Sequence, residues 1–300
     1  MRIAGGAVAA ATQPLFAHTG SAVIPASQAA SVEVDLVLPP NVAPERVTNE
    51  VAYTLKPGSD LAPMIADLEI DTEVLINRQP AIVIEPPIRG KGWLAASACC
   101  RPNLHRDLRV AVDGARIETP EMFAVDWAKV KNDRLVEGDG KTNEQYYGFG
   151  QDVFAIADGT VVYVHGGMPD ETPFVMMVPK SKADYGGNNI ILKIAPNVFA
   201  WYAHLREGSI TVKVGERVKA GQLIGKLGNS GPSEAPHLHF GLLDKPDPVA
   251  GRSLPFVFAS STLDGWLDFG ASKEDRLVIQ PDARQVRSAY PLYGSIQNYP

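Results

Sequence analysis

The feature that most constrains the fold of this chain is the spacing of glycine between residues 208 and 231. Glycines at positions 215, 221, 225, 228 and 231 separate runs of only a few residues. Glycine tolerates the positive φ of tight turns, and an amphipathic helix needs a much longer periodic run. Just before these glycines, Ile210–Val214 alternates apolar and polar side chains. The region therefore predicts a compact module of short β-hairpins.

The rest of the chain has the same character. Val32–Leu38 alternates apolar and acidic residues, which is typical of a half-buried strand. Asn189–Ile194 is rich in β-branched residues, and Asp113-Gly114 predicts the tight turn of a hairpin. No long amphipathic helix is evident among 27 glycines and 24 prolines. We expect an all-β protein with an N-terminal β-sandwich-like domain and a second, antiparallel β domain.

Changes in composition and strand pattern along the sequence suggest four segments. Residues 1–31 are rich in Ala, Ser and Gly and are expected to be a disordered or signal-like N-terminus. Residues 32–107 would form the small β domain and residues 108–270 the second one. Residues 271–300 are expected to be a tail that is mostly coil, with one strand at Arg276–Ile279.

Composition excludes several functional classes. The formal net charge of −6 argues against a nucleic-acid partner, because such binding rests on Lys and Arg meeting phosphate. The apolar run Ile3–Ala11 is far shorter than the ~20 residues of a membrane-spanning helix. Two cysteines, Cys99 and Cys100, cannot form a Cys-ligated zinc cluster, and being adjacent they are expected to be free thiols. Any bound metal must therefore use carboxylates and some of the six histidines.

The local motif that most suggests a functional site is His-x-His in Pro236–Phe240. Alternate residues of a strand point to the same face, so His237 and His239 are expected to project together. Two such imidazoles can ligate a cation, or one can ligate while the other transfers a proton. The alternative is that both are structural histidines of a strand.

A third histidine, His204, ends the β-prone run Val198–His204. The motif Tyr202–Leu205, the glycine-spaced segment Val212–Gly231 and the His-x-His motif together resemble the LytM/lysostaphin-type zinc metallopeptidases. Those enzymes cleave peptide cross-links in bacterial cell walls. The segment Phe149–Val162 is similar to a further block of the family, so the resemblance covers about residues 120–240.

The resemblance implies a site. His239 and Asp126 match zinc ligands, His237 matches the general base, and His204 matches the histidine that stabilises the oxyanion. It implies Zn²⁺ as cofactor, a peptidoglycan peptide or another peptide as substrate, and a periplasmic or extracellular location.

The sequence departs from the family at one ligand. The family has His four residues before the aspartate, and here Met122 stands four residues before Asp126. A thioether suits soft ions rather than zinc. The other register, with Asp152 and Gly148, also lacks the histidine and conflicts with the Phe149–Val162 match.

His105 and His165 are two histidines that could supply the missing ligand, and otherwise both would be exposed polar residues. Two functions stay open. The chain could be an active zinc endopeptidase, which three retained histidines favour. It could be a catalytically degenerate pseudoenzyme that binds cell wall or regulates a hydrolase, which Met122 favours. A lipoyl-type carrier is disfavoured because the Met-Lys-Met attachment signal is absent.

Overall fold

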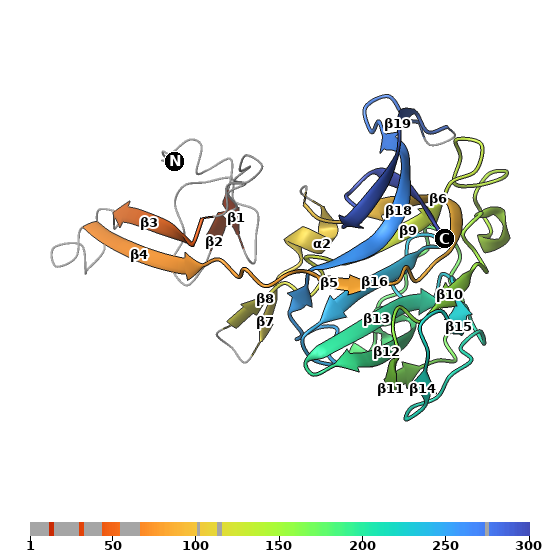
Figure 1. Ribbon diagram of the computed structural model, residues 1–300, viewed down its shortest axis with the longest axis horizontal. Coiled ribbons are helices and arrows are strands. Elements are labelled where there is room, and N and C mark those ends of the chain that lie inside the picture. The colour runs from red at the N-terminus through yellow and green to blue at the C-terminus, as the bar shows by residue number, and fades with distance from the viewer. Residues whose placement is uncertain are drawn as a thin grey trace. The chain divides into compact units, whose positions relative to one another are not determined.

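Figure 1 shows the computed structural model, which describes residues 12–14, 30–32, 44–54, 67–100, 103–112, 116–273 and 276–300. The expected all-β class is confirmed. In these ranges the only α-helix is α2, the single turn Leu104–Asp107, and the 3₁₀ helices are η1 (Asn143–Gln145) and η2 (Lys182–Gly186). None of the helices in the described part could span a bilayer. The chain divides into two compact units, Met1–Pro80 and Ala81–Pro300.

The described residues of the first unit form two antiparallel pairs of strands. One pair is β1 (Thr12–Pro14) with β2 (Ala30–Val32), and the other is β3 (Arg46–Thr54) with β4 (Asp67–Leu75). The expected N-terminal sandwich, like the expected domain limits, stays a prediction.

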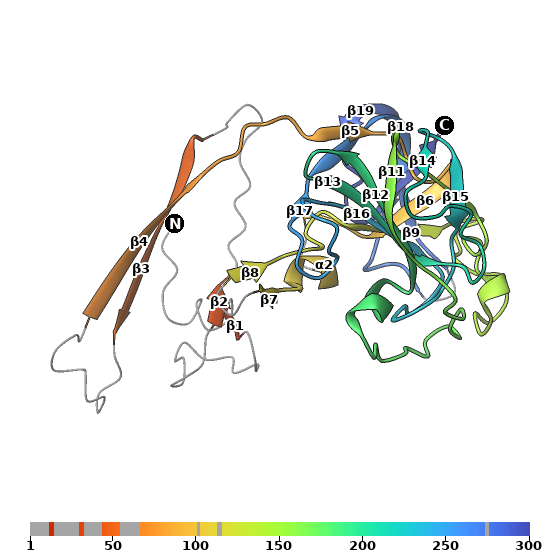
Figure 2. The ribbon, with the colours of Figure 1, turned by 90° about the horizontal axis from the view of Figure 1, so that it is seen from below.

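The second unit is built on one large, twisted sheet, seen in Figure 1 and, from below, in Figure 2. Its hydrogen-bonded order is β14-β11-β12-β13-β16-β9-β6-β20-β18-β19, with β17 beside β16 and β5 beside β18. Two further pairs, β10–β15 and β7–β8, complete the unit. The strands are β5 (Ile82–Ile84), β6 (Gly90–Ser97), β7 (Val110–Val112), β8 (Arg116–Glu118), β9 (Val125–Lys129), β10 (Asp152–Phe154), β11 (Gly159–His165), β12 (Asn188–Ala195), β13 (Val198–Leu205), β14 (Arg217–Val218), β15 (Leu223–Lys226), β16 (Leu238–Leu243), β17 (Ser253–Leu254), β18 (Phe256–Leu267), β19 (Ile279–Ala289) and β20 (Ser295–Tyr299).

The C-terminal residues differ from the sequence-based expectation. Residues 271–300 are not mostly coil, because they supply β19 and β20, which both pair with β18. Pairing of β20 with β6 and β18 buries Ile296 and Tyr299. These two strands are stabilised by pairing with β18, which precedes them, and with the distant β6, and a local pattern does not reveal that pairing. Cys99 and Cys100 also differ from expectation, since the structure joins them in a disulfide.

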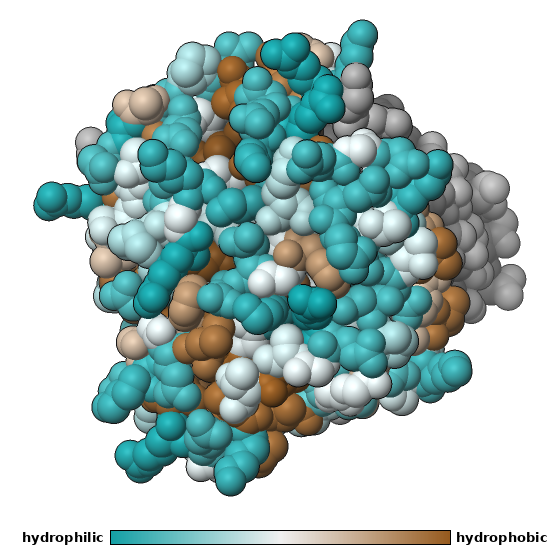
Figure 3. Space-filling model, turned by 90° about the vertical axis from the view of Figure 1, so that its right-hand side faces the viewer, coloured by the Kyte–Doolittle hydropathy of each residue, from teal (hydrophilic) through white to brown (hydrophobic). Residues whose placement is uncertain are grey.

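The hydrophobic core lies on one face of the central strand β16. Leu238 and Phe240 point into the main core, where Trp127 packs against Phe240 with ring centroids 6.0 Å apart. His239, between these two core residues, points to the opposite face, where Trp201 belongs to a second, smaller cluster. The outer surface seen in Figure 3 is mostly hydrophilic with scattered hydrophobic patches. Because Leu238 and Phe240 are packed in the main core, the backbone of β16 is fixed at His239, and the ring of His239 faces away from that core.

Candidate active site

Strand register places two of the candidate residues, His239 and Asp126, side by side. Across the sheet, His239 on β16 lies opposite Asp126 on β9 and opposite Ala203 on β13. Directly opposed residues on antiparallel strands have neighbouring side chains on one face. His204 follows Ala203 and has a left-handed φ of +57°, an uncommon conformation for a non-glycine residue. The backbone is therefore bent at His204, the third of the candidate histidines.

His105 reaches the same place from the short helix α2. Asn103 caps this helix by accepting a hydrogen bond from the Arg106 backbone N–H at 3.1 Å, and its amide donates to the Ala98 carbonyl at 2.6 Å. His105 Nδ1 lies 3.3 Å from the Ala124 carbonyl oxygen, so this nitrogen carries the proton. His105 Nε2 lies 2.9 Å from Asp126 Oδ2. The ring is therefore held between two acceptors, with Nδ1 toward the Ala124 carbonyl and Nε2 toward the Asp126 carboxylate.

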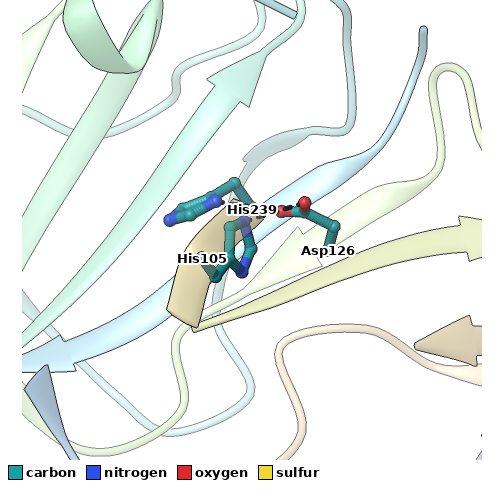
Figure 4. Close-up of side chains that lie close together, drawn as sticks. All are labelled: His105, Asp126 and His239. Atoms are coloured by element: carbon teal, nitrogen blue, oxygen red, sulfur yellow. Dashed lines mark hydrogen bonds and ion pairs between the residues drawn. The ribbon is translucent and has the colours of Figure 1, made fainter. Parts of the chain in front are cut away.

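His105, Asp126 and His239 form one compact group, and Figure 4 shows their side chains turned toward one another. One ligand atom from each lies within 4.8 Å of the others, and His239 Nδ1 is 2.9 Å from Asp126 Oδ1. Burial opposes the charged form of His105, but Asp126, with smaller contributions from Glu121 and the Ala124 carbonyl, outweighs it and raises the pKa of His105 to about 9. Burial likewise opposes the charge of Asp126, but His105 and His237 hold its pKa well below the usual value.

His237 and His204 lie next to this group, with their ring centroids 4.8 Å apart. His237 Nδ1 is 2.8 Å from the Ala235 carbonyl oxygen, and His204 Nδ1 is 2.9 Å from the Ser230 carbonyl oxygen. Each Nδ1–H is thus donated to the backbone. His237 Nε2 then lies 3.5 Å from Asp126 Oδ1. Two imidazoles therefore present Nε2 as a proton acceptor beside the His105–Asp126–His239 group.

The electrostatics separate His204 from His105. Burial, with His237 and His239 nearby, lowers the pKa of His204 well below its usual value. His204 is therefore neutral near pH 7, and its Nε2 accepts rather than donates a hydrogen bond. Stabilising an oxyanion, the role that the resemblance implied for His204, would require its protonated form.

The four expected site residues, Asp126, His204, His237 and His239, are thus brought together. Of the two histidines considered as substitutes, His105 joins them, and it is only 4% exposed rather than an exposed polar residue. His165 is half-buried and lies 3.8 Å from Asp184, outside the group.

The two positions weighed for the missing ligand lie elsewhere. Met122 sits half-buried in the turn that precedes β9 and is not a member of the group. Asp152 is exposed and pairs with Lys226 at 2.5 Å, so the alternative register does not place an aspartate at this site.

Two site residues have no counterpart in the sequence-based prediction. Glu121 is buried, and its carboxylate oxygens lie 3.9 Å from the Nε2 atoms of His105 and His239. Tyr185 donates a hydrogen bond to Glu121 Oε1 at 2.6 Å. Glu121 precedes Met122 directly, but no local pattern distinguishes it from a surface glutamate.

Comparison with known proteins gives a match to part of the chain. A family model described as Peptidase family M23 matches residues 146–250. The glycyl-glycine endopeptidase ALE-1 of Staphylococcus capitis is 55% identical over 56 residues, which cover 18% of this chain and 15% of that protein. The peptidoglycan DD-endopeptidase ShyA of Vibrio cholerae is 33% identical over 108 residues, which cover 36% and 23%.

Among solved structures, the catalytic domain of lysostaphin from Staphylococcus simulans is 26% identical, with a TM-score of 0.29, and the match covers 48% of this chain and 80% of that one. The chain spans less than a quarter of the length of ALE-1 and of ShyA. The matched region contains His204, His237 and His239. Residues 146–250 of this chain are thus similar to peptidase family M23.

Proposed function

We propose that this protein is a zinc metalloendopeptidase that acts on peptide bonds of bacterial cell-wall peptidoglycan. The observation that carries the proposal is the convergence of His105, Asp126 and His239 on one point. His237 and His204 lie beside them with acceptor nitrogens directed to the site.

The donor set suits zinc. Catalytic zinc sites have three nitrogen or oxygen ligands from the protein and keep one open position. His105 Nε2 and His239 Nδ1 both face the Asp126 carboxylate at 2.9 Å, on different oxygens. In the neutral ring, Nδ1–H is donated to the Ala124 carbonyl, so the Nε2 lone pair would be available to a cation. These three residues would hold the metal, and Met122 is not needed as a ligand.

The chain's own residues would manage the protons. Zinc bound at this group would polarise the scissile carbonyl and lower the pKa of a water toward ~7. His237 Nε2 would take the proton of the attacking water, because the other ring nitrogen is fixed on the Ala235 carbonyl. The protonated ring would then deliver that proton to the leaving amine. His204, neutral at first, would serve as a second acceptor and would stabilise negative charge only after it gains a proton.

The substrate class rests on the relatives. ALE-1 is named a glycyl-glycine endopeptidase and ShyA a peptidoglycan endopeptidase, and each match covers a minor part of those proteins. A peptidoglycan substrate in turn implies that the protein works in the periplasm or outside the cell. The alternative, a catalytically degenerate member that binds cell wall or regulates a hydrolase, rested on Met122. The position of His105 beside Asp126 weakens that alternative.

The test is zinc content together with hydrolysis. After chelation and reloading, we expect about one zinc per chain and release of new amino groups from purified peptidoglycan. His239→Ala should lose both, whereas His165→Ala, which alters a histidine outside the group, should keep both. A wild-type protein that binds peptidoglycan but holds no zinc and releases no amino groups would support the degenerate alternative.

A further inference from the structure

We propose that Glu121 is a positioning residue that accepts the Nε2–H of His239 and thereby turns Nδ1 of that ring toward the metal. This inference rests on the proposed zinc site. Nothing in the family match points to Glu121, which lies upstream of residues 146–250.

The two ring nitrogens of His239 face different surroundings. Nδ1 lies 2.9 Å from Asp126 Oδ1, on the side where His105 also faces the aspartate. Nε2 is buried and has no hydrogen-bond partner among the described residues. A neutral imidazole that binds a cation through one nitrogen carries its proton on the other. The proton of His239 therefore points away from the metal, toward Glu121 Oε1 at 3.9 Å.

Glu121 serves His239 rather than His105, although it lies 3.9 Å from Nε2 of both rings. His105 already donates its proton from Nδ1 to the Ala124 carbonyl. Its Nε2 therefore has no proton to offer when it acts as a ligand. His239 has no such backbone acceptor, and a carboxylate is the usual acceptor for the second nitrogen of a metal-binding histidine.

Tyr185 and Trp201 hold this arrangement in place. Tyr185 donates its hydroxyl to Glu121 Oε1, and burial with the nearby Glu121 charge raises the pKa of Tyr185, so the hydroxyl keeps its proton. The ring of Tyr185 stacks on Trp201 with centroids 6.0 Å apart, and Trp201 meets His239 edge-on at 4.6 Å. The carboxylate and the imidazole are thus fixed by one aromatic framework.

Zinc affinity measured by competition with a chelator tests the proposal without reference to activity. Glu121→Leu removes both acceptor oxygens, and we expect zinc to bind about 10–100-fold more weakly. Glu121→Gln keeps one acceptor oxygen and should recover part of that loss. The control is Glu118→Leu, which changes a glutamate with the same 6% exposure that lies 3.6 Å from Arg252 Nε. It should bind zinc as the wild type does.

A spectroscopic readout separates positioning from a general packing effect. In zinc-loaded protein with ¹⁵N-labelled histidine, the hydrogen-bonded Nε2–H of His239 should give a downfield proton resonance. In Glu121→Gln this resonance should move upfield, and in Glu118→Leu it should not. If Glu121→Leu binds zinc as tightly as Glu118→Leu, or if the resonance is unchanged in Glu121→Gln, the proposal is overturned. Zinc affinity unaffected by His105→Ala would instead overturn the proposed metal site itself.

Discussion

The site is assembled from two regions of the second unit that differ in how they can be recognised. Residues 146–250 match the peptidase family and carry His204, His237 and His239. Residues 81–145 lie outside that match and carry His105, Glu121 and Asp126. The matched region thus holds the proposed proton-transfer histidines and one proposed ligand. The unmatched region holds the other two proposed ligands and the buried glutamate.

The site residues of the two regions are therefore brought together in two different ways. In the matched region, His239 lies on β16 and His237 directly precedes that strand, and alternate residues of extended backbone face the same side. In the unmatched region, His105 and Asp126 are 21 positions apart on different elements, α2 and β9. They meet only because β6 pairs with β9 and Asn103 fixes the following helix turn against Ala98. The first arrangement follows from spacing, and the second follows from tertiary packing.

The largest effect on zinc binding is expected for His105→Ala. If the unmatched region supplies a ligand, the variant should lose more than the ~100-fold in zinc affinity that removing an outer partner costs, and peptidoglycan hydrolysis should fall with it. Zinc per chain and chelator competition are the measurements, with His165→Ala as the matched control. Full zinc occupancy in His105→Ala would show that the matched region holds the metal without it.

The matched and unmatched regions also differ in how much of each the sequence alone predicts. Alternation and turn residues predicted the all-β class, and the His-x-His motif predicted that His237 and His239 lie together. The strands at Ile279–Ala289 and Ser295–Tyr299 were missed, because they are stabilised by pairing with β18 rather than by their own pattern. His105 could be named only as a candidate, because no local rule connects a histidine on a four-residue helix with an aspartate 21 residues later.

Within the matched region, a proposed proton-transfer group can be removed without changing any of the proposed ligands. His237→Ala should lower the rate of peptide hydrolysis by about 10²–10⁴-fold, the usual contribution of a general base. Zinc content should stay near that of the wild type, because His237 Nδ1 is bound to the Ala235 carbonyl and His237 is not one of the three proposed ligands. Steady-state kinetics and metal analysis of one preparation separate these effects. Parallel loss of zinc would contradict the assignment.

The contact between the two regions also predicts a pH dependence in metal-free protein. The pKa of His105 is raised from 6.5 to about 9 in the folded state. Its pairing with Asp126 therefore stabilises the fold fully below pH 6.5, and this stabilisation is lost as the pH rises through 9. The loss should be on the order of 3 kcal/mol, since one pKa unit corresponds to about 1.36 kcal/mol.

Urea unfolding with chelator present, at pH 6.5 and pH 9.5, measures this loss. Asp126→Asn should flatten the dependence, because burial lowers the pKa of His105 and, without the Asp126 carboxylate, only the smaller effects of Glu121 and the Ala124 carbonyl raise it. Equal pH dependence in the wild type and the variant would argue against the His105–Asp126 pairing.

A smaller effect should follow from loosening α2 alone. Asn103→Ala removes the N-cap of the helix turn that carries His105 and should lower the free energy of unfolding by about 1 kcal/mol. Zinc affinity should fall by less than in His105→Ala, because the ligand itself remains. Asn77→Ala, at an exposed position of the first unit, serves as control and should change stability by less than ~0.5 kcal/mol. An unchanged stability of Asn103→Ala would mean that the cap is not what fixes His105.

The smallest effect is expected at Met122, the position where family spacing would place a histidine. Met122→Leu conserves volume and removes the thioether, so its cost in stability should stay below about 1.5 kcal/mol. Zinc affinity should change by less than ~2-fold, because the proposed ligands are His105, Asp126 and His239 and Met122 lies outside that group. Chelator competition measures Met122→Leu alongside His105→Ala. A loss of zinc affinity in Met122→Leu as large as that in His105→Ala would indicate that the ligand lies at position 122, where family spacing would place it. The distinction between the two regions would then be wrong.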